Sequence, residues 1–208
     1  MPTTHPSPTT SLPPLDDDGR RLLFTEARTA NSFTEEPVSD EQLREIYELM
    51  KFGPTSANIN PLRILFVRPG EARERLAALM NERNRAKTAS APIVAVLAND
   101  HAFHERIPEL VPFKPELREM FAADDAMRES SARYNGALQA AYFIFAVRAV
   151  GLAAGPMIGF DAAGTDAEFF AGTTWRSHLV VNIGNPGPDA WFDRLPRLDH
   201  DDVVRYAG

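Results

Sequence analysis

Residues 124–150 read DDAMRESSARYNGALQAAYFIFAVRAV, and this stretch does most to decide the fold. Its second half, Ala137 to Val150, is apolar on nearly every side. A helix with that pattern is buried inside a protein rather than laid on its surface. Gly151 follows directly and can end the helix in a left-handed conformation. We therefore expect one long central helix with the rest of the chain packed around it.

Short apolar runs on both sides of this helix predict a sheet. They are residues 63–68 (RILFVR), 93–97 (IVAVL) and 177–183 (SHLVVNI). Continuous apolar runs of this length are typical of strands that are buried on both faces. We expect about three or four strands in all.

The other segments predict mainly helices. Ser39 and Gln42 have the spacing of a capping box, and an apolar stripe follows them as far as Met50. Residues 71–82 predict a second helix. Three prolines break residues 100–123, which we expect to form short helices and loops that cap the body.

Strands and helices do not alternate here as strictly as they do in a doubly wound parallel sheet. The predicted fold class is therefore α+β, an α/β sandwich in which the long buried helix lies against a small mixed sheet. Five of the 17 prolines fall in residues 1–14, among serines and threonines. Such a segment cannot bury enough apolar surface to offset its ordering entropy. We predict a disordered proline-rich leader over residues 1–15 and one folded domain over residues 16–208.

Composition excludes several functional classes. The 208 residues include no cysteine, which excludes disulfide frameworks, thiolate metal sites and a cysteine nucleophile. The formal net charge of −7 argues against nucleic acid as the main partner, because phosphate backbones attract clustered positive charge. The longest charge-free apolar run, Tyr134 to Val147, is too short to span a membrane. Residues 1–19 lack the basic and apolar parts of a signal peptide, so we expect a cytoplasmic protein without a membrane partner.

Familiar catalytic signatures are missing from the sequence. It has no nucleophile elbow, no P-loop and no dinucleotide-binding glycine motif. His101 and His104 lie three residues apart with Glu105 beside them, but a metal site would need a further ligand. We expect two exposed surface histidines, with metal binding as the lesser alternative. No metal site and no catalytic side chain is predicted.

Three other segments carry groups that suit a ligand. Residues 27–33 (ARTANSF) combine an arginine, hydroxyls and an amide, which together suit a phosphate. Residues 53–61 (GPTSANINP) form a loop of small hydrogen-bonding side chains that could address the edge of a flat heteroaromatic ring. Residues 155–161 (GPMIGFD) offer a backbone that could lie flat against a planar ligand. The alternatives are ordinary helix-end polarity, a turn without a ligand and simple tight packing, respectively.

Together these segments make the chain resemble the flavin-dependent nitroreductase family. The family's R-[ST]-x-R-x-F phosphate motif is matched over residues 28–33, with Asn31 in place of the second arginine. Its P-S-S-x-N-x-Q-P-W loop is matched over residues 54–62, and its glycine–proline segment over residues 151–157. A basic residue near the C-terminus is matched within residues 194–198 (RLPRL). The resemblance spans about residues 20–205.

Within the family, four motifs most resemble the malonic semialdehyde reductases of the pyrimidine-utilisation (Rut) pathway and their NADH dehydrogenase/nitroreductase relatives. The motifs are A-R-T-x-N, K-x-G-P-T-S-A-N-x-x-P-x-R-I, G-P-M-x-G-F-D and R-L-P-R-L, and all four occur here in that order. This resemblance implies bound FMN at the interface of an intertwined homodimer, with residues of both subunits around it.

The resemblance also implies which residues contact the FMN. Those for the phosphate and ribityl chain are Arg28, Thr29 and Asn31, with Arg194 and Arg197 as candidates for a further positive charge. Those for the polar edge of the isoalloxazine are Pro54, Thr55, Ser56 and Asn58. Those that back the ring are Gly155, Pro156 and Met157, with a backbone N–H near the flavin N5.

The implied activity is hydride transfer by bound FMN from NADH or NADPH to a small acceptor, with ping-pong kinetics. The implied acceptor is an aldehyde such as malonic semialdehyde, reduced to 3-hydroxypropanoate. Two alternatives stay open: the same cofactor with a nitro, quinone or enone acceptor, and a flavin-binding protein without turnover. Ile158 stands where many family members have glutamate, so nitroaromatic reduction does not follow from the resemblance alone.

Overall fold

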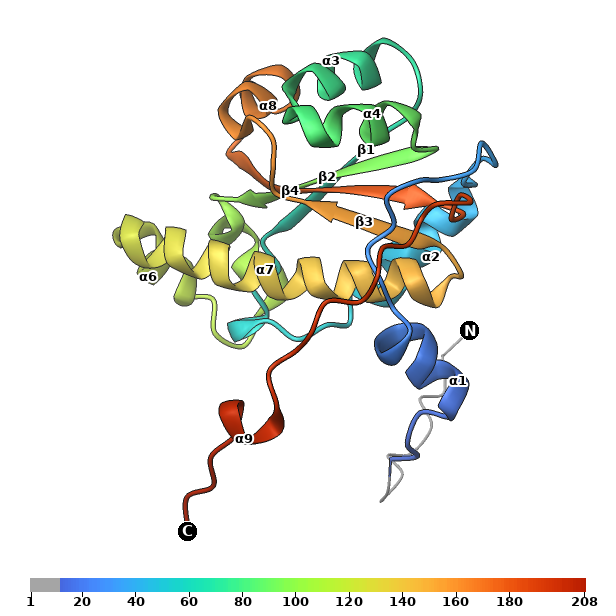
Figure 1. The fold of residues 1–208 in the computed structure, drawn as a ribbon. Helices are drawn as coiled ribbons and strands as arrows, with labels where there is room; N and C mark the ends of the chain where they lie inside the picture. Colours follow the sequence, from blue (N-terminus) through green and yellow to red (C-terminus); the bar gives the residue numbers. More distant parts are fainter. Residues whose placement is uncertain (1–11) are drawn as a thin grey trace, which may run out of the picture.

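The structure, a computed structural model, describes residues 12–208. The predicted leader, residues 1–15, therefore falls mostly outside the described residues. A four-stranded sheet crosses the middle of the molecule (Figure 1), with the strand order β1-β2-β4-β3. The strands are β1 (Leu62–Val67), β2 (Ile93–Asp100), β3 (Ala153–Met157) and β4 (Trp175–Gly184).

The sheet is antiparallel throughout, so the expectation of a mixed sheet is wrong for the described chain. The end of β1 lies beside the start of β2, because Val67 is opposite Val94. The start of β3 lies beside the end of β4, because Ala153 is opposite Gly184. Each connection between paired strands thus returns to the same end of the sheet from which it left. Neighbouring strands therefore run in opposite directions.

Helices cover both faces of the sheet and make the predicted sandwich (Figure 1). On one face lie α2 (Asp40–Met50) and α7 (Asp125–Ala149). On the other face lie α3 (Glu71–Leu79), α4 (Glu82–Ser90) and α8 (Ala162–Phe169). Side chains of β2 alternate between two apolar cores: Ile93 and Ala95 belong to the first, and Val94 and Val96 to the second. Burial on both sides explains why this strand is a continuous apolar run.

The long helix α7 confirms the central element of the prediction. The Asp124 side chain caps it by accepting a hydrogen bond from the Met127 N–H at 2.9 Å, and Gly151 ends it with φ of 81°. Burial is confined to one side, however. Tyr134 and Tyr142 are 64% and 36% exposed in the described chain, so part of the apolar surface has no cover within it.

Helices α4 and α8 and strand β3 were not predicted from the sequence. Strand β3 contains Gly155 and Pro156, which are disfavoured within sheets. It lies at the edge of the sheet, where a proline can be tolerated because the outer side of the strand makes no ladder bonds. Helix α8 follows it, capped by the Asp161 carboxylate, which accepts a hydrogen bond from the Gly164 N–H at 3.0 Å.

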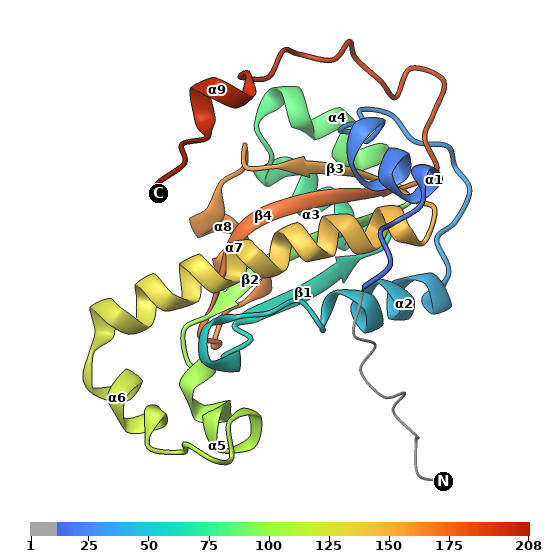
Figure 2. The same ribbon diagram turned by 90° about the horizontal axis from the view of Figure 1, so that it is seen from below.

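A cap formed by residues 101–123 projects from one end of the sandwich (Figure 2). It contains a 3₁₀ turn (Phe103–Arg106), α5 (Ile107–Leu110) and α6 (Leu117–Ala123). Phe103, Ile107 and Phe121 pack there against Ile59, which belongs to the loop before β1. The cap is thus fastened to one of the segments with predicted ligand-binding groups.

Both ends of the described chain leave the sandwich. At the N-terminal side, α1 (Asp17–Arg20) continues into a π-helical turn, Arg21–Thr25. At the C-terminal side, the chain after β4 crosses the body and ends in an extended arm that carries the short α9, His200–Val203 (Figures 1 and 2). No helix within residues 12–208 is both long and apolar enough to cross a membrane.

Candidate functional site

The first predicted segment, residues 27–33, lies against the edge strand β3. The Ala30 N–H donates to the Ala154 carbonyl at 3.0 Å, and the Asn31 N–H donates to the Ala190 carbonyl at 2.9 Å. Gly155 permits this close approach, because a Cβ at that position would stand 2.6 Å from the Ala30 carbonyl oxygen. The segment is therefore held between β3 and the chain that follows β4.

Positive charge gathers at this segment. Arg28 donates to the Phe192 carbonyl at 3.2 Å, and Arg194 donates to the Thr25 carbonyl at 2.6 Å. Lys87 of α4 extends its Nζ to 3.4 Å from Asn31 Oδ1. Burial lowers the pKa of Lys87, and no neighbouring carboxylate in the described part of the chain offsets this effect. An ammonium group in such surroundings is suited to an anionic ligand.

Sequence reasoning missed Lys87 because it lies 56 residues from Asn31 and is brought there only by packing. Asn84, one turn earlier on the same face of α4, donates its side-chain N–H to the Gly159 carbonyl at 3.0 Å. Helix α4 therefore contacts both residues 27–33, which we call the phosphate segment after its predicted ligand, and the segment after β3. The one signal in the sequence is this pair of polar residues three positions apart. The helix predicted over residues 71–82 corresponds to α3, and α4 was not predicted.

The end of α4 is held from the interior by Arg73, which is only 2% exposed. Its guanidinium donates to the carbonyls of Thr88, Ala91 and Val67. Burial lowers the pKa of Arg73 to about 10, which leaves it charged near neutral pH. Asn182 of β4 adds a hydrogen bond from its side-chain N–H to the Lys87 carbonyl at 3.1 Å. The backbone of Lys87 is thus fixed from two sides.

A pocket of about 210 Å³ adjoins Arg28. Arg148 from the end of α7 also lines it, together with Trp191 and Glu26. Burial lowers the pKa of Arg148, whose hydrogen bond goes to the Leu23 carbonyl at 3.5 Å. Positive groups therefore line the space on this side of the phosphate segment as well.

The second predicted segment is the loop before β1. Its backbone is strained, because Ala57, Asn58 and Asn60 have φ values of 49°, 51° and 42°. Side chains with a Cβ rarely adopt this left-handed region, and alanine has no polar group that would compensate. Strain of this kind persists where surrounding contacts impose it, and it clusters at functional sites.

Contacts from two other elements hold this loop. The Ser56 N–H donates to Asn135 Oδ1 of α7 at 2.7 Å, and Thr55 Oγ1 accepts from the Asn60 N–H at 3.4 Å. The Asn58 side chain donates to the Leu110 carbonyl of the cap at 3.0 Å. Pro54 and Ser56 are exposed. The loop thus presents an exposed, rigid edge that carries polar groups.

These two segments lie at diagonally opposite corners of the molecule. The loop precedes β1 at one edge of the sheet, whereas residues 27–33 lie alongside β3 at the other edge. The two edges are about 14 Å, or three strand spacings, apart. Along the strands, Leu62 is level with Asn99 and Arg176, whereas Ala154 is level with Ile183. This offset adds roughly 20 Å. One chain alone does not bring both segments to a single flavin.

The remaining predicted residues lie at the β3 edge and on the C-terminal arm. Gly155 and Met157 are buried in β3, and Pro156 is partly exposed along its edge. Thr29 is exposed beside Arg28. Arg194 lies at the phosphate segment of its own chain, whereas Arg197 bonds only the carbonyls of its neighbours Leu195 and Pro196 on the arm. Of the two arginines, only Arg194 contacts residues next to Arg28 within one protomer.

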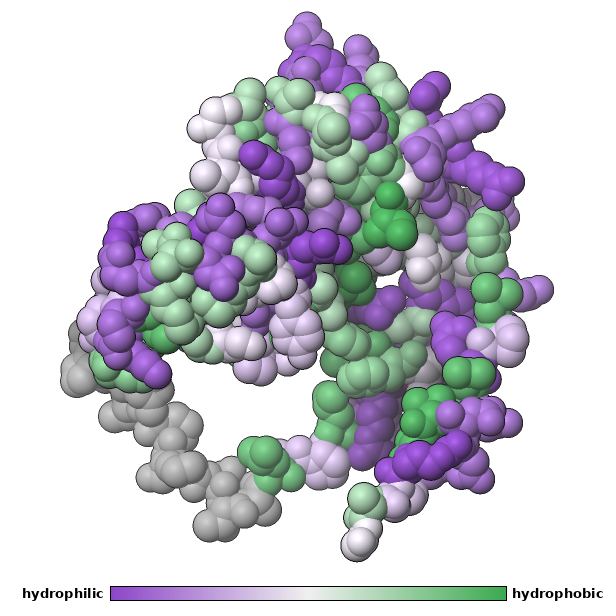
Figure 3. Space-filling view, turned by 90° about the vertical axis from the view of Figure 1, so that its left-hand side faces the viewer, coloured by the Kyte–Doolittle hydropathy of each residue, from purple (hydrophilic) through white to green (hydrophobic). Residues whose placement is uncertain are grey.

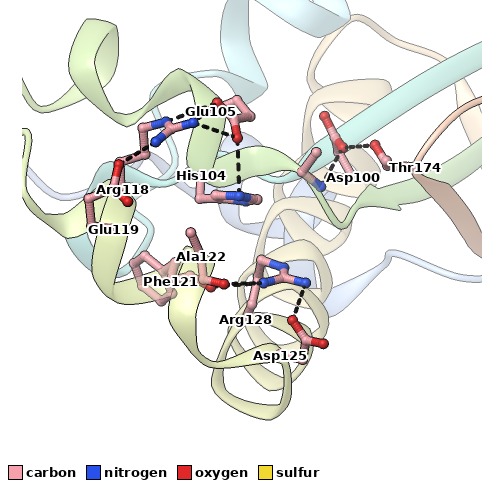
Figure 4. A network of polar contacts seen from close by, with 11 residues as sticks. Asp100, His104, Glu105, Arg118, Glu119, Phe121, Ala122, Asp125, Arg128 and Thr174 are labelled. Atoms are coloured by element: carbon pink, nitrogen blue, oxygen red, sulfur yellow. Dashed lines mark hydrogen bonds and ion pairs between the residues drawn. The ribbon is translucent and has the colours of Figure 1, made fainter.

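The prediction for the cap histidines is wrong for His104, which is buried. Its Nε2 lies 3.3 Å from Glu105 Oε1, while its Nδ1 is buried without a partner among the described residues. Figure 4 shows His104 between Glu105, which Arg118 holds through two hydrogen bonds, and Arg128 of α7. The aromatic core of the cap encloses this ring, which sequence spacing alone could not reveal. No group of metal-binding side chains large enough to hold an ion occurs in residues 12–208.

Comparison with known proteins identifies relatives of this chain. The model of the nitroreductase family matches residues 25–185. A Streptomyces coelicolor protein, provisionally named an NADH dehydrogenase/NAD(P)H nitroreductase, is 53% identical over 94% of this chain and 97% of its own length. A Streptomyces griseus protein with the same provisional name is 56% identical over 91% of this chain and 96% of its own.

The fold also matches a solved structure. An Exiguobacterium sibiricum protein, provisionally named a nitroreductase and determined in complex with FMN, superimposes with a TM-score of 0.82. The match covers 92% of this chain and 98% of that one, at 16% sequence identity. At this identity the likeness establishes the shared fold.

Proposed function

The chain belongs to the nitroreductase family and is an FMN-dependent NAD(P)H oxidoreductase, and we propose that it reduces a small aldehyde such as malonic semialdehyde. The names of its relatives and the FMN in a structure of the same fold support the cofactor and the electron donor. The observation on this chain that carries the proposal is the group of Arg28, Asn31 and Lys87 at the edge of β3.

The residues of this corner fit the phosphate end of FMN. Arg28 and Lys87 have hydrogen bonds only to neutral groups, and Thr29 adds an exposed hydroxyl beside them. Two polar atoms nearby, Ser32 Oγ and Asn182 Oδ1, are buried without a partner in the described chain. A phosphate and a ribityl chain with its hydroxyls would supply the charge and the donors that these groups lack.

The isoalloxazine end requires a second copy of the chain. We propose a homodimer in which the loop at residues 54–58 of one protomer reaches the β3 edge of the other. The separation of the two segments within one protomer supports this arrangement. Further support comes from apolar surface without cover: Tyr134 and Tyr142 on α7, and Leu195, Leu198 and Tyr206 on the arm. Figure 3 shows hydrophobic surface along the middle of one face and at the lower right, where the arm leaves the body.

When bound, FMN would supply the redox chemistry, which is hydride transfer from NADH or NADPH to the acceptor. The chain binds and orients it. Arg28, Thr29, Asn31 and Lys87 would hold the phosphate and ribityl chain, with Arg194 adjacent. The backbone of Gly155 to Met157 would back the ring, and Asn58 of the partner subunit would address its polar edge. Both substrates then use the same face in turn, which gives ping-pong kinetics.

The acceptor is the finer part of the proposal. The aldehyde is supported by the four sequence motifs, and a broader nitro, quinone or enone acceptor is supported by the names of the relatives. Ile158, which is 80% exposed directly after β3, makes this part of the surface apolar. An apolar group there, where many family members have glutamate, removes a negative charge that would repel the carboxylate of malonic semialdehyde.

The test starts from the visible spectrum of the purified protein. We expect a yellow protein with flavin absorbance that NADH or NADPH bleaches without oxygen. Initial rates should give parallel double-reciprocal lines, and kcat/KM for malonic semialdehyde should exceed that for a nitroaromatic. The reverse order of kcat/KM would favour the broad-acceptor alternative. Protein that binds no added FMN would contradict the proposal. Bound FMN that neither NADH nor NADPH reduces would indicate a flavin-binding protein without turnover.

A further inference from the structure

Two buried amide side chains of α7 face the loop before β1. Asn135 is 1% exposed and Gln139 is 4% exposed. They lie one turn apart, so they project from the same side of the helix. Asn135 Oδ1 accepts from the Ser56 N–H at 2.7 Å, and Gln139 Oε1 accepts from the Leu62 N–H at 2.9 Å. The two amides thus hold the loop near both of its ends.

Gln139 also starts a series of amide contacts that runs through the strained part of the loop. Its Nε2 donates to Asn60 Oδ1 at 3.1 Å, and Asn60 Nδ2 donates to Asn58 Oδ1 at 2.9 Å and to the Asn58 carbonyl at 2.7 Å. Asn58 Nδ2 in turn donates to the Leu110 carbonyl of the cap at 3.0 Å. The two asparagines in this series are among the residues with positive φ.

The close packing of α7 brings both amides within reach. Gly136 lies between them in sequence, and a Cβ there would stand 1.7 Å from Asn99 Oδ1 of β2. Any larger residue would push the helix away from the sheet and from the loop. Burying an amide costs desolvation energy, which its hydrogen bonds must offset, whereas a buried apolar side chain carries no such cost. Their use here is therefore tied to the loop that they bond.

We propose that Asn135 and Gln139 are positioning residues that hold the loop at residues 54–60, with the left-handed Ala57, Asn58 and Asn60, in the conformation needed to contact the isoalloxazine of the partner subunit. The proposal rests on the proposed function, because it assigns the loop to the flavin. Neither amide touches the cofactor. They act through Ser56 and Asn60, and without them the backbone of Ala57, Asn58 and Asn60 would relax to ordinary φ values. A preorganised loop binds the ring without a further ordering cost.

The test compares variants of equal size and different hydrogen bonding. Asn135→Leu and Gln139→Leu remove the bonds to the loop and replace each amide by an apolar group of similar shape. Asn135→Asp keeps an oxygen that accepts from the Ser56 N–H in either protonation state. Thr165→Val is the matched control: Thr165 is also fully buried and donates to the Asp161 carbonyl at 2.7 Å, but it lies on α8 on the other face of the sheet.

The readouts are the FMN dissociation constant and the visible circular dichroism of bound FMN, beside the midpoint of thermal unfolding. We expect both leucine variants to bind FMN about tenfold more weakly and to change the dichroism, as the loss of one or two hydrogen bonds would do. Asn135→Asp should stay within about threefold of the wild type. Thr165→Val should lower the unfolding midpoint and leave both flavin readouts unchanged.

Asn60→Gly serves if a leucine variant fails to fold. It removes the amide that Gln139 holds, keeps a residue that tolerates positive φ, and leaves the core intact. We expect it to weaken FMN binding as Gln139→Leu does. The proposal is overturned if wild-type protein binds FMN and turns over while these variants share its affinity and its dichroism. A wild type that binds no FMN would instead overturn the proposed function.

Discussion

Asn31 departs from the family's phosphate motif, yet a positive charge still lies beside it because Lys87 approaches from another element. The phosphate motif has Asn31 where a second arginine is usual, which removes one cation from residues 28–33. Lys87 of α4 approaches the same side chain, with its Nζ 3.4 Å from Asn31 Oδ1. A neutral amide next to a lysine avoids the repulsion that two adjacent cations would cause. The charge is thus supplied by another element.

Replacement of either cation should weaken FMN binding. Arg28→Ala should cost about 1.5–3 kcal/mol of binding free energy, roughly a ten- to hundredfold rise in the dissociation constant, because a charge-assisted bond is lost. Lys87→Met should have an effect of similar size. Titration of FMN by its fluorescence measures both. Arg106→Ala, which removes an exposed arginine that pairs with Glu109 on the cap, is the control and should leave affinity unchanged. An unchanged constant for Arg28→Ala would mean that this residue is misassigned.

Buried polar side chains hold helices and strands of this fold to one another. Arg73 of α3 ties the end of α4 to the end of β1 through three backbone carbonyls. Carbonyls at a helix end have no partner within the helix, so they must find one elsewhere when they are buried. Arg73 supplies that partner and keeps Lys87 in place.

Arg73→Met should therefore destabilise the protein by about 3 kcal/mol or more, because three buried acceptors would lose their donor. Urea denaturation followed by far-ultraviolet circular dichroism measures the free energy of unfolding. Arg75→Met provides the comparison on the same helix: it removes an exposed ion pair with Glu168 and should cost under 1 kcal/mol. Equal effects of the two variants would contradict the role given to Arg73.

Two histidines, the buried His104 and the half-buried His178, make stability depend on pH. Burial lowers the pKa of His104 in the cap and of His178 in β4. As pH falls below the ordinary histidine value of about 6.5, the unfolded chain takes up protons that the native rings still refuse. Native stability should therefore decline with falling pH until the lowered pKa values are passed.

Unfolding free energies at pH 7.5 and pH 5.5 test this dependence. The wild type should be less stable at the lower pH, and His178→Gln should show a smaller difference between the two. Nε2 of His178 is buried without a partner in the described chain, so glutamine loses no hydrogen bond from that atom. An equal pH dependence in the wild type and the variant would exclude His178 as a source of it.

At the scale of the whole molecule, the separation of the two binding segments leads to a test of the dimer. If Arg28 of one protomer and Asn58 of the other serve the same flavin, two defective variants should complement each other. In a mixed dimer of Arg28→Ala and Asn58→Ala chains, one site has both intact residues and the other has neither. Random exchange of subunits should restore about a quarter of the sites.

The measurement is NADH oxidation after the two variants are unfolded and refolded together. The mixture should exceed the mean activity of the two variants refolded separately. Refolded Arg28→Ala mixed with wild type is the control for refolding, because half of its sites keep both residues whether or not the subunits exchange, and its activity should equal the mean of the two. A mixture no more active than the separate variants would mean that both residues serve a flavin within one chain, or that the chain works alone.

Much of the fold could be predicted because it depends on neighbours in the chain. The capping box at Ser39 and Gln42 is present with both hydrogen bonds, at 3.2 and 3.0 Å. The apolar runs became β1, β2 and β4, and the long helix begins and ends within a residue of its predicted bounds. Strand β3 escaped because a glycine and a proline oppose local strand propensity, and only its place at a sheet edge allows them.

The site was less predictable, since it depends on residues that are distant in sequence. The motifs name Arg28, Asn31 and the loop at residues 54–58, and their roles as FMN ligands remain predictions. No local pattern indicated Lys87 or the buried amides Asn135 and Gln139. The burial of His104 likewise follows from how the cap closes around Phe103 and Phe121, and not from the spacing of histidines.

The amino-acid sequence by itself determined most of the elements, the family and the candidate groups for cofactor binding. These follow from periodicity, capping and short motifs, which act over a few residues. Only the tertiary structure decided that residues 27–33 and the loop before β1 lie at opposite corners, that Lys87 approaches the first, and that Asn135 and Gln139 hold the second. Strand order, register and helix packing place those groups, because they join residues that the chain itself keeps far apart.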